Sequence, residues 1–256
     1  AFNLNTLSGL VKFVKKVLFG TLTVEGIGAA LYMAAFVPRF GARGIWISVF
    51  NAVSAFCNAG MDIIGENSLC DYAADSVVNF TTAALVIIGG LGYIVWWDIL
   101  RVLRMKRDGR YKLFASLTLH SKIVLCSTAL LITGGALLIF CFEYGNPETI
   151  GDMSVWGKIQ ASVFQSVTTR TAGFATVPQE KLANASAIVS MLLMTVGGSP
   201  VGTAGGIKTV TAAVLIYEAL SVIKGKSEAS LFSRTISKNS VVKAVAVVVT
   251  FLTVVF

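Results

Sequence analysis

The sequence predicts an all-α integral membrane fold, and three observations support this prediction. Apolar residues make up 55% of the 256 positions and charged residues only 13%, whereas a soluble domain carries about 25% charged residues. The charges are clustered, and the apolar runs between them reach about 20 residues, the length of a helix that crosses a bilayer. Two parts of the sequence also repeat the same order of long and short apolar segments. We therefore expect repeated units of a transmembrane helix, a short re-entrant helix with a loop, and a second transmembrane helix.

Four apolar regions meet or nearly meet the length of a membrane span, and a fifth is shorter. They cover residues 17–37, 76–100, 123–142, 184–223 and 244–256. The region 184–223 is about twice as long as one span, and a glycine-rich stretch breaks it near its middle. The sequence starts at Ala1 without a signal peptide and ends inside the fifth run, so we expect a fragment of a longer protein.

Charge is distributed unevenly among the segments that connect these regions. Most of the 21 basic residues lie in 1–16, 101–122 and 224–243, and carboxylates gather in the alternate connections. Since cytoplasmic loops collect Lys and Arg, the basic segments are expected inside and the acidic ones outside. The net charge of +8 therefore indicates membrane topology rather than nucleic-acid binding. Acidic outer loops suit the entry of cations, although any one carboxylate fits a solvated loop equally well.

Two short apolar segments lie between the predicted spans on the outer side. Residues 44–61 read GIWISVFNAVSAFCNAGM, and residues 155–174 read VWGKIQASVFQSVTTRTAGF. Each is compatible with a helix of about 13 residues, too short to cross a bilayer. The two segments share Ser-Val-Phe and, further on, Ala-Gly. This repeat predicts two half-helices that enter the membrane and return through an extended turn, a plan typical of transport proteins.

The turns after the half-helices are the candidate ion-binding residues. Extended backbone is tolerated at membrane depth only when it is buried in protein or lines a watery path. A ring of carbonyl groups can replace the hydration shell of an alkali cation, glycine keeps the path open, and the half-helix C-terminus adds a negative dipole end. The filter candidates are Asn58, Ala59, Gly60, Thr171, Ala172 and Gly173. The alternative is that Ala-Gly only turns the chain in an outer loop.

Arg170 precedes the second turn, where a positive charge would oppose a cation path. We expect its side chain to point behind the turn and to pair with a carboxylate that the sequence does not identify. Glu25 lies within the first span, so it is either a functional acid or a structural hydrogen-bond partner near the inner end.

The break in the fourth region reads TVGGSPVGTAGGIKT, a composition that cannot sustain a helix. An irregular stretch inside the membrane and below the turns is a candidate gate. Its residues are Gly197, Gly198, Gly202, Gly205, Gly206 and Lys208. Lys208 either tunes the barrier to cations or extends toward the inner surface. Thr203, Ala204 and Gly205 repeat the letters of the second turn, but no half-helix precedes them and we do not count them as a third turn.

The segments FNAVSAFCNAGM, TTRTAGF and GGSPVGTAGGIKT together resemble the KtrB/TrkH superfamily of potassium transporters, and KtrB most closely. The resemblance implies four pore repeats around one ion path, with one filter glycine from each repeat. It implies that residues 17–100 form the second repeat and 123–223 the third, with a gate loop at 197–206. Residues 1–16 and 101–122 would be cytoplasmic, and 224–256 would be a cytoplasmic loop with the truncated first helix of the fourth repeat.

The resemblance also implies a homodimer and a cytosolic nucleotide-binding regulatory subunit of the KtrA/TrkA type. It implies potassium as the transported ion, bound by filter carbonyls, with sodium dependence left open. The chain itself would need no cofactor, and nucleotide would bind only to the regulatory partner. With half a filter, the fragment is not expected to conduct as a monomer.

The leading interpretation is therefore the channel-like subunit of a potassium uptake system in the plasma membrane. The first alternative is a secondary transporter that binds a small solute at broken helices, which would require convergent polar side chains at mid-membrane. A membrane-embedded enzyme would need a cluster of His, Cys or carboxylates within the spans. His120 is the single histidine and lies in a basic loop, which argues against an enzyme.

Overall fold

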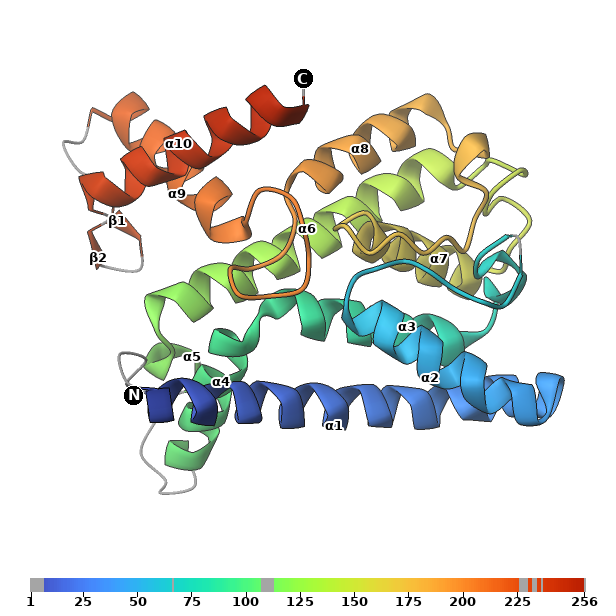
Figure 1. Ribbon diagram of the computed structural model, residues 1–256. Coiled ribbons are helices and arrows are strands. Elements are labelled where there is room, and N and C mark those ends of the chain that lie inside the picture. Colours follow the sequence, from blue (N-terminus) through green and yellow to red (C-terminus); the bar gives the residue numbers. More distant parts are fainter. Residues whose placement is uncertain are drawn as a thin grey trace.

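The computed structural model describes residues 7–65, 67–106, 113–225, 230–231, 234–235 and 237–255. Within these residues the regular secondary structure is helical, including the short 3-10 helices Cys70–Tyr72 and Gln179–Lys181, apart from a two-residue antiparallel strand pair, β1 (Ser230–Leu231) and β2 (Arg234–Thr235), and one isolated bridge. The helices are α1 (Leu7–Phe40), α2 (Ala42–Phe56), α3 (Ser76–Leu91), α4 (Tyr93–Lys106), α5 (Leu113–Ser116), α6 (Leu119–Glu143), α7 (Val155–Thr168), α8 (Asn184–Thr195), α9 (Thr209–Ile223) and α10 (Lys238–Val255). The expected all-α fold is confirmed (Figure 1).

Several helices begin where a polar side chain can accept a hydrogen bond from a free backbone N–H. The Asp75 carboxylate accepts from the N–H groups of Val77 and Val78 at the start of α3, at 3.0 and 3.2 Å. The Ser154 hydroxyl accepts from the Gly157 N–H at the start of α7, at 3.2 Å. These caps fix where the two helices begin.

Two helices are long and apolar enough to cross a membrane, within Gly9–Phe40 and Leu119–Glu143. Large apolar side chains project outward from the helices: Phe19, Leu130 and Ile223 are 76%, 73% and 80% exposed. A lipid environment accounts for this surface, because soluble proteins rarely expose wide apolar faces.

The predicted span 76–100 is not one straight helix. It divides at Gly92 into α3 and α4, which meet at 94°. Gly92 has φ +79°, and a Cβ atom there would lie 2.8 Å from the carbonyl oxygen of Pro200. The bend therefore makes room for the glycine-rich segment, a contact that the apolar pattern of residues 76–100 does not reveal.

The predicted region 184–223 is broken as expected. Helix α8 ends at Thr195 and α9 begins at Thr209, and residues 196–208 between them form the glycine loop. In Figure 1 this loop lies in the middle of the molecule, between α6 and α9. The fifth run forms α10, which packs against α9.

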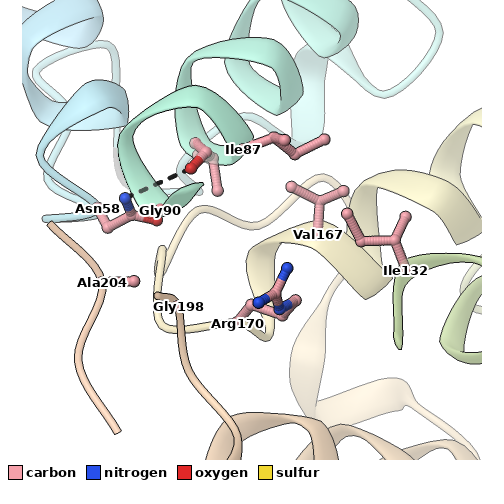
Figure 2. Close-up of a pocket in the computed structure, with 9 residues that line it drawn as sticks. Asn58, Ile87, Gly90, Ile132, Val167, Arg170, Gly198 and Ala204 are labelled. Carbon is pink, nitrogen blue, oxygen red and sulfur yellow. Dashed lines mark hydrogen bonds between the residues drawn. The ribbon is translucent and has the colours of Figure 1, made fainter. Parts of the chain in front are cut away.

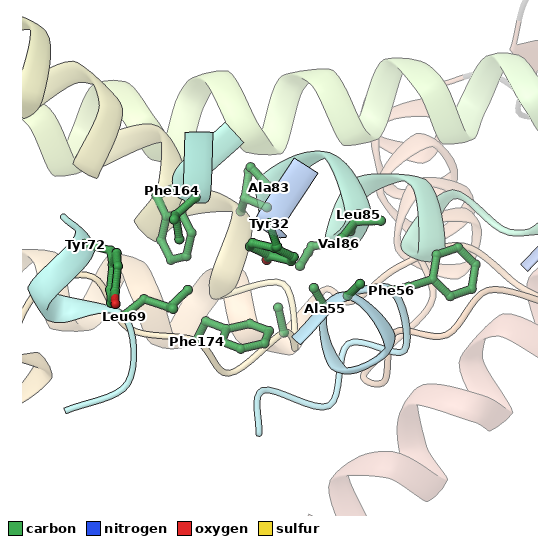
Figure 3. Packing of buried hydrophobic residues seen from close by; sticks show 14 of the residues in the cluster. Tyr32, Ala55, Phe56, Leu69, Tyr72, Ala83, Leu85, Val86, Phe164 and Phe174 are labelled. Carbon is green, nitrogen blue, oxygen red and sulfur yellow. The ribbon is translucent and has the colours of Figure 1, made fainter. Parts of the chain in front are cut away.

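One hydrophobic core joins the two repeated units. Helix α2 runs back along α1 and also packs on α3, while α7 packs on α6 and α3. Phe56 and Tyr72 of the first unit and Phe164 and Phe174 of the second lie in the same buried cluster (Figure 3). Helices α2 and α7 are thus held by a shared core, which fixes how the turns after them approach each other.

Glu143, which sequence patterning places among the outer acidic residues, is 1% exposed. Its carboxylate accepts hydrogen bonds from Asn146 Nδ2, Thr149 Oγ1 and the Ala183 N–H, at 2.7, 2.6 and 2.9 Å. Because a buried carboxylate is stable only when its oxygens are bonded, these contacts hold the loop that follows α6 onto the start of α8.

Candidate functional site

The two turns have the same backbone pattern. Asn58 and Thr171, the first residues of the turns, have φ +53° and +70°. Gly60 and Gly173, the third residues, have φ +68° and +92°. Positive φ is unusual for residues other than glycine, so its recurrence at aligned positions is a conformational repeat that matches the sequence repeat.

The two turns also touch. A Cβ atom on Gly60 would meet the Ala172 carbonyl oxygen and would lie 2.7 Å from the Cα atom of Gly173. A Cβ atom on Gly173 would lie 3.2 Å from the Cα atom of Gly60. Gly60 therefore has no room for a side chain, a Cβ on Gly173 would be tightly placed, and the predicted filter residues of both units come together.

Hydrogen bonds hold the chain that follows each turn. The Thr168 hydroxyl donates to the Phe174 carbonyl at 2.6 Å. The Leu69 N–H of the first unit donates to the Ala175 carbonyl of the second at 2.9 Å, and the Ala175 N–H donates to Ser68 Oγ at 3.3 Å. The return segments are thus bonded to each other across the two units.

Arg170 lies beside the second turn. The expectation that its side chain pairs with a carboxylate is wrong for the described residues. The ion pairs found in the described part of the chain are Arg39–Asp75, Arg101–Asp98 and Lys181–Glu148. The Arg170 side chain instead donates from Nη2 to the Gly197 carbonyl at 2.9 Å, and the residue is only 7% exposed. Its partner is the backbone of the glycine loop, which a search for acidic residues could not identify.

The glycine loop closes on itself at its base. Val196 and Ile207 form an isolated parallel bridge, in which the Gly197 N–H donates to the Ile207 carbonyl at 3.0 Å. Lys208 donates from Nζ to the Ala204 carbonyl at 2.5 Å. The Lys208 side chain therefore turns back onto the loop and does not extend away from it toward a membrane surface.

Several loop glycines are required by close backbone approach. A Cβ atom on Gly197 would meet the Gly205 carbonyl oxygen, and a Cβ atom on Gly198 would lie 2.7 Å from the Gly90 carbonyl oxygen. Gly202 is also close to Gly90, and Gly206 has φ +68°. Gly205 differs, because the nearest atoms to its added Cβ belong to Thr171, at 3.9 Å.

The loop is docked on the C-terminal end of α3. The Ser199 N–H donates to the Gly90 carbonyl at 2.8 Å, and the Thr203 N–H donates to the Gly89 carbonyl at 3.2 Å. Sequence reasoning set Thr203 aside because no half-helix precedes it, and it missed this glycine pair. The signal available was the run GGLG at residues 89–92, which interrupts an otherwise bulky apolar span.

A cavity of about 10 Å³ lies where the loop, the second turn and α3 meet. Figure 2 shows Asn58, Arg170, Gly90, Gly198 and Ala204 around it. That volume is about the space of a single water molecule. The loop is therefore closely packed against both turns.

Among the described residues no three His, Cys, Asp or Glu side chains are grouped so that they could hold a metal ion. The turns instead offer backbone carbonyl groups, which are ligands for alkali cations. Helices of membrane-crossing length and a wide exposed apolar surface define the class of helical membrane proteins, and within it two units bring similar turns together.

Comparison with known proteins assigns the family. Residues 4–256 match the family described as TrkH, cation transport protein. The chain therefore belongs to the TrkH family of cation transport proteins.

Individual relatives and a solved structure agree with this family. The chain is 39% identical to the potassium/sodium uptake protein NtpJ of Enterococcus hirae, over 95% of the chain and 52% of that protein. It is 35% identical to the Ktr system potassium uptake protein B of Bacillus subtilis, over 100% of the chain and 56% of that protein. The fold matches the crystal structure of the potassium transporter TrkH from Vibrio parahaemolyticus with a TM-score of 0.74 at 15% identity, over 94% of the chain and 49% of that structure. The chain thus spans about half the length of the relatives it matches.

Proposed function

We propose that the chain is part of the pore-forming subunit of a Ktr/Trk-type system that takes up potassium across the plasma membrane. The relatives named for potassium uptake support this assignment. The observation that carries it is the contact between Gly60 and Gly173, in turns with the same pattern of positive φ.

The filter proposal follows from this backbone pattern. The sign of φ alternates along the first turn: φ is positive at Asn58 and Gly60 but not at Ala59. Alternation of this kind can turn successive carbonyl groups toward one side of the chain, where they can replace water around a dehydrated cation. The proposed filter residues are Asn58, Ala59, Gly60, Thr171, Ala172 and Gly173. Two further turns, from the rest of the protein, would complete the ring.

The glycine loop is the proposed gate, with Gly197, Gly198, Gly202, Gly205, Gly206 and Lys208 as its residues. It is non-helical backbone docked against both turns, where its displacement would open space beneath them. The proposed units are 17–100 and 123–223, with the basic segments 1–16, 101–122 and 224–243 in the cytoplasm.

The assembly is proposed to be a homodimer with a cytosolic nucleotide-binding regulatory subunit of the KtrA/TrkA type. The basic segments would offer that partner a docking surface. In this proposal the chain is a transporter rather than an enzyme and needs no cofactor of its own. Sodium is a coupled ion to be tested, since one relative is named for both ions.

The experiment expresses the full-length gene in cells that lack potassium uptake and measures growth at low potassium. Gly60→Ala and Gly173→Ala should abolish rescue, because each added Cβ meets the other turn and sits at positive φ. Gly134→Ala on α6 is the matched control, since nothing lies within 4 Å of its added Cβ. Membrane levels of each variant are measured by immunoblot. Growth supported equally by all three variants would refute the filter assignment.

A further inference from the structure

The glycine loop is bonded to both turns by side chains. Arg170 Nη2 donates to the Gly197 carbonyl at 2.9 Å, and the Gly205 N–H donates to Thr171 Oγ1 at 2.8 Å. Asn58 Nδ2 donates to Thr203 Oγ1 at 2.7 Å. We infer that these three hydrogen bonds, here named the loop latch, couple the position of the glycine loop to the conformation of the two turns. This inference rests on the function proposed above.

Arg170 contributes a bond that is costly to break. It is 7% exposed, its hydrogen bond is to a carbonyl group, and its Nε atom is buried without a partner. An unpaired charged group in a buried site is strongly unfavourable. Since the adjoining cavity measures about 10 Å³, the docked loop leaves room for about one water molecule. Displacement of the loop must therefore be accompanied by hydration of Arg170.

Thr203 extends the latch to the first half-helix. Its hydroxyl accepts from Asn58 and donates to the Phe56 carbonyl at 2.8 Å, at the C-terminal end of α2. The C-terminal end of α2, the negative end of its dipole, points toward the first turn. One of its carbonyl groups also accepts a hydrogen bond from the loop. Release of the loop would remove the Thr203 hydroxyl from both groups, leaving the Asn58 amide with only its longer bonds to the Phe56 and Val86 carbonyls, at 3.4 and 3.5 Å.

The bonded residues of the turns are the two non-glycine residues held at positive φ. Asn58 and Thr171 have φ +53° and +70°, a sparsely populated region that persists only when the surroundings hold it. The loop supplies one hydrogen bond to each of these side chains. Since coupling is reciprocal, an ion that stabilises the turns should also stabilise the docked loop, and loop displacement should loosen the turns.

The test measures loop displacement by the rate at which a small maleimide labels Ala204→Cys, because Ala204 is 3% exposed in the docked loop. The full-length protein is used in membranes, with its native cysteines replaced and potassium uptake retained. Wild-type latch residues should give slow labelling that potassium slows further relative to choline. Thr171→Val and Thr203→Val keep side-chain shape and remove one hydroxyl each, and Arg170→Gln removes the charge.

Each variant should raise the labelling rate about fivefold or more, and Thr171→Val and Thr203→Val should abolish the potassium effect. Thr133→Val is the matched control, because its hydroxyl donates to the Ala129 carbonyl within α6, at 2.7 Å. If Thr133→Val labels at the wild-type rate, removal of a hydroxyl within a helix does not by itself unfold the protein and raise labelling. The loop latch is overturned if the three variants are labelled at the wild-type rate. It is also overturned if potassium still slows labelling in both Thr171→Val and Thr203→Val. Failure of the proposed function would appear separately, as absence of potassium uptake with wild-type latch residues.

Discussion

Single hydroxyl groups fix the second turn at the scale of residues. Thr168 is the last residue of α7, and its hydroxyl reaches beyond the turn to the Phe174 carbonyl at 2.6 Å. Thr169 follows it, but its hydroxyl donates to the Ser166 carbonyl of the same helix at 3.0 Å. Both neighbours thus donate a hydroxyl hydrogen bond to a backbone carbonyl, but only the bond of Thr168 crosses the turn.

Thr168→Val should weaken both the fold and ion selection. Phe174 is 2% exposed, and its carbonyl would lose a buried hydrogen bond, at a cost of about 1–3 kcal/mol in the free energy of unfolding. The potassium-to-sodium uptake ratio should fall, because the return segment no longer holds the turn. Thr169→Val is the control and should leave the ratio unchanged. Equal ratios in both variants would show that Thr168 does not position the filter.

Sequence reasoning identified residues of the site more readily than the contacts between them. The turn glycines were predicted because Ala-Gly follows both short apolar segments, and the loop glycines because glycine pairs interrupt an apolar region. The Arg170–Gly197 bond was not predicted, since a backbone carbonyl has no signature in the sequence. Thr203 bonds to Asn58, far away along the chain, and a single sequence contains no information on such pairing.

At the scale of elements, the bend between α3 and α4 shapes the site. The apolar pattern of residues 76–100 predicts one span, because hydropathy registers length and composition but not direction. The bend arises where the glycine loop occupies the space that a straight helix would need, next to Gly92. The loop and the bend are thus one structural feature formed by two distant segments.

Gly92→Ala should destabilise the full-length protein by about 1–3 kcal/mol, the cost of a non-glycine residue in a sparsely populated backbone region. The added Cβ would also lie 2.8 Å from the Pro200 carbonyl oxygen. Gly26→Ala on α1 is the control, since nothing lies within 4 Å of its Cβ and alanine favours a helix by about 1 kcal/mol. Thermal unfolding in detergent should therefore shift down for the first variant and slightly up for the second. A shift of the same sign for both would contradict this account of the bend.

At the scale of the whole molecule, the segments that follow the two turns are bonded to each other across the two units. Cys70 donates weakly to the Ala175 carbonyl, with Sγ 3.7 Å from the oxygen, so this thiol marks the place where the first unit joins the second. Burial raises the pKa of the Cys70 thiol above its ordinary value, and the nearby carboxylates of Asp71, Glu180 and Asp62 raise it further. The thiolate fraction at neutral pH is therefore lower than that of a free cysteine.

This environment allows a test of which side each loop faces. In intact cells, a membrane-impermeant maleimide should label Cys70 in a full-length variant that lacks Cys57, Cys126 and Cys141. The labelling rate should rise about tenfold per pH unit below the thiol pKa and continue to rise beyond the pH at which a free cysteine levels off, because the thiolate is the reactive form. Ser237→Cys, within the predicted cytoplasmic segment 224–243, should be labelled only after permeabilisation. Labelling of Ser237→Cys in intact cells would reverse the proposed topology. A Cys70 rate that levels off at the pH of a free thiol would show instead that the outer loops are open to water.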